Sequence, residues 1–174
     1  MSSNYLEQLA VEWYEYRGFF VRRNVPVGQA DGGGAEAELG IVAVAPGESR
    51  IVHLEASMDA HSWEVREQRF ARKFAAGRAY LPDALGDFGH ACDLAQFALV
   101  ALGSGVNHPT LGGGKMLTLG EFLVEILADL RAGEGATMTV PQQFPMLRTL
   151  QFVSENGKAI VPVLLDQDPR QITF

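Results

Sequence analysis

The sequence predicts an α/β domain in which helices flank a mixed central β-sheet. Three observations support this fold class. Segments with the helical period of apolar residues alternate along the chain with short strand-like segments. Two of the strands are joined by a tight turn into an antiparallel hairpin, whereas the next strand follows a long helix. The order helix, strand, hairpin, helix, strand, helix is therefore typical of one layered domain built on a mixed sheet.

The size and composition of the chain narrow its class. A chain of 174 residues is about one domain, so we expect a core in residues 4–132 and a C-terminal extension in residues 133–174. The apolar runs are too short to cross a bilayer, and the N-terminus lacks the pattern of a signal peptide. A single cysteine, Cys92, excludes an internal disulfide framework. These features predict a cytoplasmic protein with no membrane contact.

The charge distribution gives a mixed indication about nucleic acids. The formal net charge of −7 argues against a protein that coats nucleic acid non-specifically. Five basic residues nevertheless fall on one expected helix, and they are Arg66, Arg69, Arg72, Lys73 and Arg78. Such a run is usually a solvated helix face, and the alternative is a phosphate-binding face formed by Arg66, Arg69 and Lys73.

The first elements are a helix and a strand. Residues Asn4–Arg17 carry apolar side chains at three- and four-residue spacing, which is typical of an amphipathic helix. Gly18 stands where helices often end in a left-handed cap. The segment Phe19–Val25 then predicts a short strand, and the glycine-rich residues 29–34 predict a loop too short to separate two domains.

The central feature is a hairpin over residues 36–59 that carries acids on one face. Pro46–Ser49 has the composition of a turn, and side chains alternate along the strands on either side. The acidic faces comprise Glu36, Glu38, Gly40, Val42 and Val44 in the first strand and Ile51, His53, Glu55, Ser57 and Asp59 in the second. Carboxylates held on buried strands usually need a cation, because an unpaired buried charge is very costly.

A helix and a buried strand follow the hairpin. His61–Tyr80 predicts a helix, and the proline of Leu81–Asp83 predicts its end. The apolar stripe of this helix consists of Trp63, Phe70 and Phe74. We expect residues 82–93 to be irregular and Leu94–Leu102 to form a central strand buried on both faces.

The remaining elements are a loop and short helices. Val106–Lys115 predicts a loop, and its Gly112–Lys115 segment lacks the spacing of a Walker phosphate loop, so it indicates a connector or at most a backbone phosphate contact. Thr118 and Glu121 have the spacing of a capping box, which predicts a helix start. Prolines divide the rest into short pieces, with one short helix expected over Pro145–Val153.

These motifs together resemble the PD-(D/E)XK nuclease superfamily, and within it the archaeal Holliday-junction resolvases and Mrr-like nucleases. That pattern is a glutamate on the first helix, a Gly-aromatic-x-Val-x-Arg strand, an acidic strand and a Glu-x-Lys strand. The corresponding positions here are Glu7, Gly18–Arg23, Glu38–Ala43 and Ile51–Ser57. The resemblance covers roughly residues 5–80 by motif and the later elements only by their order. It implies a three-layer restriction-endonuclease-like fold.

The resemblance also implies a chemistry. Nucleases of this superfamily hydrolyse DNA phosphodiester bonds with Mg²⁺ or Mn²⁺, which polarises the phosphate. It implies metal ligation by Glu38 and Glu55, helped by Glu7. The expected catalytic set comprises Glu55 and Ser57 at motif positions, with Glu38 and Lys73 as substitutes for motif residues.

Two positions depart from the family pattern. Gly40 stands where the family has its aspartate, and Ser57 stands where it has its lysine. Glu38 or Glu36, on the same face of that strand, would substitute for the missing ligand. Arg69 or Lys73, on the following helix, would replace the missing positive charge. These departures leave a second hypothesis open, a catalytically inactive member of the fold that binds nucleic acid or a protein partner.

Each candidate residue has a simpler interpretation as well. Glu55 would otherwise be an exposed hairpin glutamate, and Glu7 a solvated helix residue. His53 would be a hydrogen-bonded core histidine. Asp59 and His61 could form a metal pair, but we prefer Asp59, or alternatively Ser62, as the cap of the following helix. The apolar C-terminal segment Leu147–Leu165 is a candidate surface for a homodimer.

Overall fold

The computed structural model describes residues 4–101, 108–132 and 139–165. The chain divides into two compact units, Met1–Phe122 and Leu123–Phe174, which are described here one at a time. None of the helices that the structure describes combines the length and the apolar character that a membrane crossing requires.

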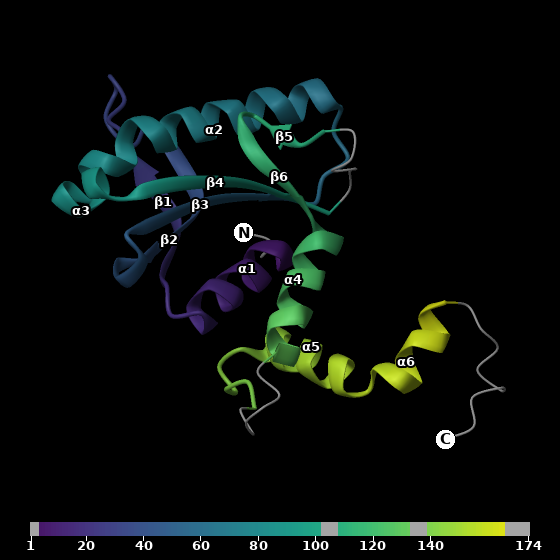
Figure 1. Ribbon diagram of the computed structural model, residues 1–174. Helices are drawn as coiled ribbons and strands as arrows, with labels where there is room; N and C mark the ends of the chain where they lie inside the picture. The colour runs from purple at the N-terminus through teal and green to yellow at the C-terminus, as the bar shows by residue number, and fades with distance from the viewer. Residues whose placement is uncertain (1–3, 102–107, 133–138, 166–174) are drawn as a thin grey trace. The chain divides into compact units, whose positions relative to one another are not determined.

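The first unit contains the sheet and its helices (Figure 1). Its helices are α1 (Tyr5–Tyr16), α2 (Trp63–Ala84), α3 (Gly86–Ala91) and the start of α4 (Leu119–Ala132), and a short 3-10 turn spans Pro46–Glu48. Its strands are β1 (Phe20–Val27), β2 (Ala37–Ala45), β3 (Arg50–Ser57), β4 (Asp93–Val100), β5 (Thr110–Leu111) and β6 (Gly114–Thr118). The second unit contains the rest of α4 with α5 (Pro145–Glu155) and α6 (Gly157–Leu164).

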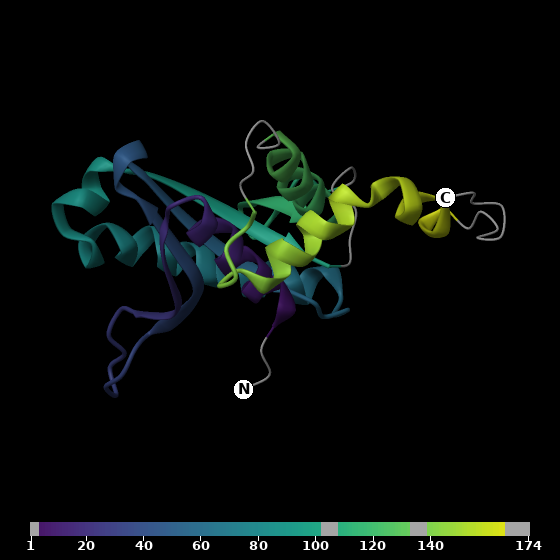
Figure 2. The same cartoon turned by 90° about the horizontal axis from the view of Figure 1, so that it is seen from below.

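The sheet of the first unit is mixed and has the order β1-β2-β3-β4-β6-β5. The pairs β1–β2, β2–β3 and β5–β6 are antiparallel, and the pairs β3–β4 and β4–β6 are parallel. Helix α2 covers one face of the sheet and α1 lies against the other, as Figures 1 and 2 show from two directions. The predicted α/β class, with a mixed central sheet flanked by helices, is confirmed.

The core between α2 and the sheet consists of two apolar clusters. One contains Phe70, Phe74, Ala98, Val100, Leu111 and Met116, with Trp63 packed against it. The other contains Val27, Leu39, Val42, Ile51 and Leu81. The predicted apolar stripe of α2 is therefore confirmed, and this packing fixes the helix over the strand that carries Glu55.

The N-terminal boundaries agree with the prediction. Asn4 is the N-cap of α1, and its side chain accepts a hydrogen bond from the backbone N–H of Leu6. Gly18 has φ +85°, the left-handed conformation expected of a residue after a helix end. The hairpin of β2 and β3 is confirmed, with its turn at Pro46–Glu48.

Helix α2 extends beyond its predicted end. It continues through Pro82 to Ala84, and α3 follows at once, so the prediction of irregular structure over residues 82–93 is wrong. Leu81 is 1% exposed in the core, so tertiary packing holds the last turn in helical conformation. A proline so close to a helix end removes only one helical hydrogen bond.

The loop predicted over Val106–Lys115 is wrong from Thr110 onward, and residues 106 and 107 lie outside the described part of the chain. A tight hairpin pairs Leu111 with Gly114. Gly112 and Gly113 form its turn with φ +60° and +81°, the positive values that a type I′ turn requires. Strand β4 is central as expected, but only its C-terminal half is fully buried.

The predicted capping box is confirmed at the start of α4. The hydroxyl of Thr118 accepts the backbone N–H of Glu121 at 3.2 Å, and the carboxylate of Glu121 accepts the backbone N–H of Thr118 at 2.8 Å. The backbone N–H and the hydroxyl of Thr118 both donate to the Glu121 carboxylate, and these two hydrogen bonds lower the pKa of Glu121. The short helix predicted at Pro145 is also confirmed, and it extends to Glu155.

Candidate active site

Glu55 is the centre of a buried polar cluster in the first unit. It lies on β3 and is 5% exposed. Its Oε1 accepts the backbone N–H of Gly40 at 2.7 Å and lies 3.0 Å from Nε2 of His53. Its Oε2 accepts a hydrogen bond from Nζ of Lys73 at 2.7 Å. A buried carboxylate is tolerated here because three donors and one positive charge surround it.

The pKa of Glu55 reflects these contacts. Burial alone would raise it, but the hydrogen bond from His53, the charge and hydrogen bond of Lys73, and the Gly40 N–H together hold it below the ordinary value of 4.5. Glu55 is therefore ionised at neutral pH. The simpler interpretation of Glu55 as an exposed hairpin residue does not agree with its burial.

Gly40 faces this carboxylate directly. The pairing of β2 with β3 ends at Ile41 and Leu54, so the next amide, that of Gly40, is available to bind the side chain of Glu55. A Cβ atom at position 40 would lie 3.0 Å from Oε2 of Glu55. A side chain at position 40, where the resembled family has an aspartate, would therefore contact Glu55.

Helix α2 supplies two basic groups to the same region. Lys73 contacts Glu55, as described above. Nη2 of Arg69 lies 2.6 Å from Oδ2 of Asp59 and 2.9 Å from Oγ of Ser57. Of the two candidates for the missing positive charge, Lys73 is therefore the one that reaches the Glu55 carboxylate.

Asp59 forms an ion pair with Arg69. Of the two caps predicted for α2, Ser62 occupies the N-cap position and Asp59 does not. Although partial burial opposes it, hydrogen bonds from Ser57 and Arg69 and the charge of Arg69 lower the pKa of Asp59 from 3.8 to about 2. Asp59 is strongly ionised and orients the guanidinium. Its Oδ1 accepts the backbone N–H of His61, so the two residues are linked through the backbone.

Glu7 joins the site from the other side of the sheet layer. Nδ2 of Asn4 lies 3.5 Å from the carbonyl of Ala56, which ties the start of α1 to β3. Burial and the negative charge of Glu55 raise the pKa of Glu7, and Lys73 and Arg23 oppose that rise. Glu7 is therefore not simply a solvated helix residue, because it responds electrostatically to Glu55.

A cavity of about 220 Å³ connects these groups. Its lining residues are Glu7, Glu55, Ala56, Arg69, Phe70 and Lys73. Two carboxylates and two cations thus meet in one small polar cavity, with β3 on one wall and α2 on another. Perturbed carboxylates that converge in a cavity are typical of functional sites.

Other predicted site residues lie elsewhere. Glu38 is exposed on β2 and does not line the cavity, so the structure does not bring it to Glu55. Arg66 is buried beside Trp63, and only Arg69 and Lys73 of the expected basic face line the cavity. Glu36 interacts with the hydroxyl of Tyr80. Within residues 4–101, 108–132 and 139–165, no three His, Cys, Asp or Glu side chains are grouped closely enough to hold a metal ion.

The glycine run before Lys115 has a packing role. The backbone N–H of Gly112 donates to the carboxylate of Glu67 on α2 at 2.9 Å. A Cβ atom on Gly112 would lie 2.4 Å from the backbone nitrogen of Ala71. The glycine allows the β5–β6 turn to approach α2 closely, which the sequence pattern alone does not reveal.

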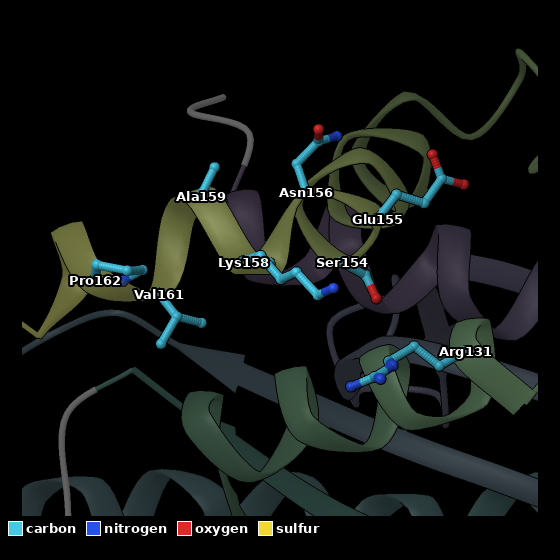
Figure 3. A pocket seen from close by; sticks show the side chains of 9 residues that line it. Arg131, Ser154, Glu155, Asn156, Lys158, Ala159, Val161 and Pro162 are labelled. Carbon is cyan, nitrogen blue, oxygen red and sulfur yellow. The ribbon is translucent and has the colours of Figure 1, made fainter. Parts of the chain in front are cut away.

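A second, larger cavity of about 800 Å³ lies in the second unit. Ser154, Glu155, Asn156 and Lys158 line it at the junction of α5 with α6, and Arg131 lines it from the end of α4 (Figure 3). Lys158 and Arg131 extend toward the same space, whereas Glu155 points away from it in this view. Its lining has one acid, so it does not offer the paired carboxylates of the first cavity.

Comparisons with known proteins do not assign this site. No family model and no curated protein matches the chain. Among solved structures, the chain is similar to AF1548, a protein of unknown function, at 12% identity and a TM-score of 0.40. The match covers 88% of this chain and 97% of that one. A similarity of this strength carries no argument about function.

Proposed function

We propose that this protein is a divalent-metal-dependent nuclease that hydrolyses DNA phosphodiester bonds at the cavity around Glu55. One observation carries the proposal. Lys73 of α2 places its ammonium group 2.7 Å from the Glu55 carboxylate, in a cavity that Glu7 also lines. A positive charge therefore stands beside the glutamate of the family motif, although Ser57 occupies the family's lysine position.

The donor set suits a small hard cation. Mg²⁺ prefers oxygen ligands and often takes only one or two carboxylates from a protein, keeping several waters. Glu7 and Glu55 supply two carboxylates to one cavity. Their mutual repulsion, which contributes to the raised pKa of Glu7, would be relieved by a bound cation. When bound, the ion would supply Lewis-acid polarisation of the phosphate.

The residues of the chain would contribute electrostatics and orientation. Lys73 keeps Glu55 ionised and presents a positive charge to the cavity, where an anionic phosphate would be stabilised. Arg69 is held in one orientation by Asp59 and Ser57, and its side chain is 35% exposed. A guanidinium fixed in this way is suited to contact a second phosphate oxygen.

A second candidate is an inactive member of the same fold that binds nucleic acid or a protein partner. Its supporting observation is that Glu55 is already satisfied by Gly40, His53 and Lys73. A carboxylate with three donors does not need a cation, and position 40 provides no side chain as a further ligand. In that case the cluster stabilises the fold and has no catalytic role.

Titration calorimetry with Mn²⁺, combined with a DNA nicking assay, separates the two candidates. For a nuclease, the wild type binds Mn²⁺ and nicks DNA, and Glu55→Gln abolishes both. Lys73→Met should retain Mn²⁺ but lose roughly 100-fold or more in rate, the typical loss for a charge that stabilises a transition state. Glu48→Gln, which changes an exposed glutamate in the β2–β3 turn, is the matched control.

Two results would decide against the nuclease. Equal nicking by the wild type and Glu55→Gln would remove Glu55 from the chemistry. No Mn²⁺ binding by the wild type, together with binding by Gly40→Asp, would identify an inactive site that lacks only the family's aspartate. Gly40 does not have a positive φ, so its backbone conformation suits an aspartate, but a Cβ atom there would lie 3.0 Å from Oε2 of Glu55 and 3.2 Å from the backbone carbonyl oxygen of Leu54, so both neighbours must shift slightly.

We propose a cytoplasmic location for the protein as well. The single cysteine fits a cytoplasmic location, since disulfides are rare there. Burial raises the pKa of the Cys92 thiol, with a further contribution from Asp93, so this thiol is not activated as a nucleophile. DNA is the proposed substrate.

A further inference from the structure

A chain of hydrogen bonds leads from the surface of α2 to the Glu55 carboxylate. Arg78 donates to Oε1 of Gln96 at 2.6 Å. Nε2 of Gln96 donates to the carbonyl of Phe74 at 2.9 Å and lies 3.1 Å from Nδ1 of His53. Nε2 of His53 lies 3.0 Å from Oε1 of Glu55.

The partners fix the orientation of each group in this chain. Arg78 has only donors, so the Gln96 oxygen must face it and the Gln96 amide nitrogen must face Phe74 and His53. Nδ1 of His53 therefore accepts a hydrogen bond, and the ring carries its hydrogen on Nε2. That hydrogen points at Glu55, which as an ionised carboxylate only accepts.

The surrounding packing is shaped for this ring. His53 is completely buried, and its ring meets Phe74 edge-on at 5.2 Å between centroids. A Cβ atom on Gly77 would lie 2.3 Å from Nδ1 of His53 and 3.0 Å from Nε2 of Gln96. Glycine inside a helix costs stability, and here it provides the space that the ring and the amide need.

We propose that Gln96 and His53 are positioning residues for the site, which hold Oε1 of Glu55 so that Oε2 faces Lys73 and the cavity. The proposal rests on the function proposed above. The Gly40 N–H contacts the same Oε1, so the amide of Gly40 reports the position of the carboxylate without any metal.

Nuclear magnetic resonance of the wild type and Gln96→Leu tests the proposal. In the wild type, the His53 ring should be protonated at Nε2 and unprotonated at Nδ1. Gln96→Leu should remove this single tautomer and accelerate exchange of the Gly40 amide hydrogen, because a less firmly held Glu55 carboxylate protects that amide less. Gln8→Leu, which changes a hydrogen-bonded glutamine of α1, is the matched control.

Mn²⁺ affinity supplies the functional part of the test. Gln96→Leu should weaken binding by about 10-fold, and His53→Gln, which keeps an N–H donor, should weaken it less than His53→Leu. A His53 ring protonated at Nδ1 would overturn the proposal, as would a Gly40 amide unaffected by Gln96→Leu. If the wild type binds no Mn²⁺ while the ring and amide behave as expected, the proposed function fails and the positioning of Glu55 stands.

Discussion

At the scale of single residues, the site depends on a glycine of α2, Gly77, which leaves room for the side chains beside Glu55. Gly77 is surrounded by His53 and Gln96, whereas Gly120, in the first turn of α4, has no neighbour from another part of the structure within 4 Å of a built Cβ. The two glycines therefore have different effects on the structure. One makes room for a buried polar group, and the other is only a weak point of its helix.

Alanine substitutions should separate these roles. Gly77→Ala should lower the free energy of unfolding by about 1–3 kcal/mol, the usual cost of overpacking a core. Gly120→Ala should raise it by about 0.5–1 kcal/mol through helix propensity. Urea denaturation of both variants measures the difference. A neutral Gly77→Ala would mean that His53 can leave its position without cost.

The pKa of Asp59 predicts a pH dependence at the same scale. Its folded-state value of about 2 lies below the ordinary 3.8, so its contribution to stability is present above about pH 4 and is lost as the pH falls toward 2. The stability difference between the wild type and Asp59→Asn should therefore shrink between pH 5 and pH 2.5. Denaturation at several pH values measures it, and a constant difference would contradict the assigned pairing with Arg69.

The sequence predicts only part of the site at this scale. Glu55 and Lys73 follow from the motif resemblance and from the basic helix. The link between Gln96 and His53 joins residues 43 positions apart, so no local pattern reveals it. Glu38 shares the predicted strand face, but its exposure depends on how β2 pairs with its neighbours, which residue spacing does not determine.

At the scale of elements, local signals predicted most of the structure. The capping box of Thr118 and the turn at Pro46 act over a few residues, and both are confirmed. The β5–β6 hairpin was missed because its strands are very short and have too few side chains to show alternation. The end of α2 was misplaced because the buried Leu81 outweighs the proline beside it.

Pro82 provides a test of that balance. Pro82→Ala restores one backbone donor in the last turn of α2 and should raise the free energy of unfolding by about 1 kcal/mol. The gain is smaller than for a central proline because the position is near the helix end and the unfolded chain becomes more flexible. Chemical denaturation measures the change. A loss of stability would indicate that the rigid ring itself holds the junction with α3.

At the scale of the whole molecule, the second unit exposes apolar side chains. Val161, Val163, Leu164 and Leu165 are 50–74% exposed on and just after α6, and Phe152 is 49% exposed on α5. Exposed apolar groups gathered on one helix are typical of an interaction surface. We propose that this surface pairs two copies of the chain.

Sedimentation equilibrium tests the pairing. The wild type should show a mass that rises with concentration toward that of a dimer, and Leu164→Asp should remain a monomer because a charge at an apolar interface is costly. Val124→Asp, which changes an exposed valine of α4, is the control. A monomeric wild type at all concentrations would leave the apolar residues of α6 without this role.

The glycine at position 40 lies few base changes away from an acidic residue. A single base change turns two of the four glycine codons into aspartate codons and the other two into glutamate codons, and a side chain at position 40 would point at Glu55. A gene encoding this chain is therefore one point mutation from a second carboxylate beside Glu55. Within a growing population that mutation recurs continually, so the effect of a second carboxylate beside Glu55 is repeatedly exposed to selection.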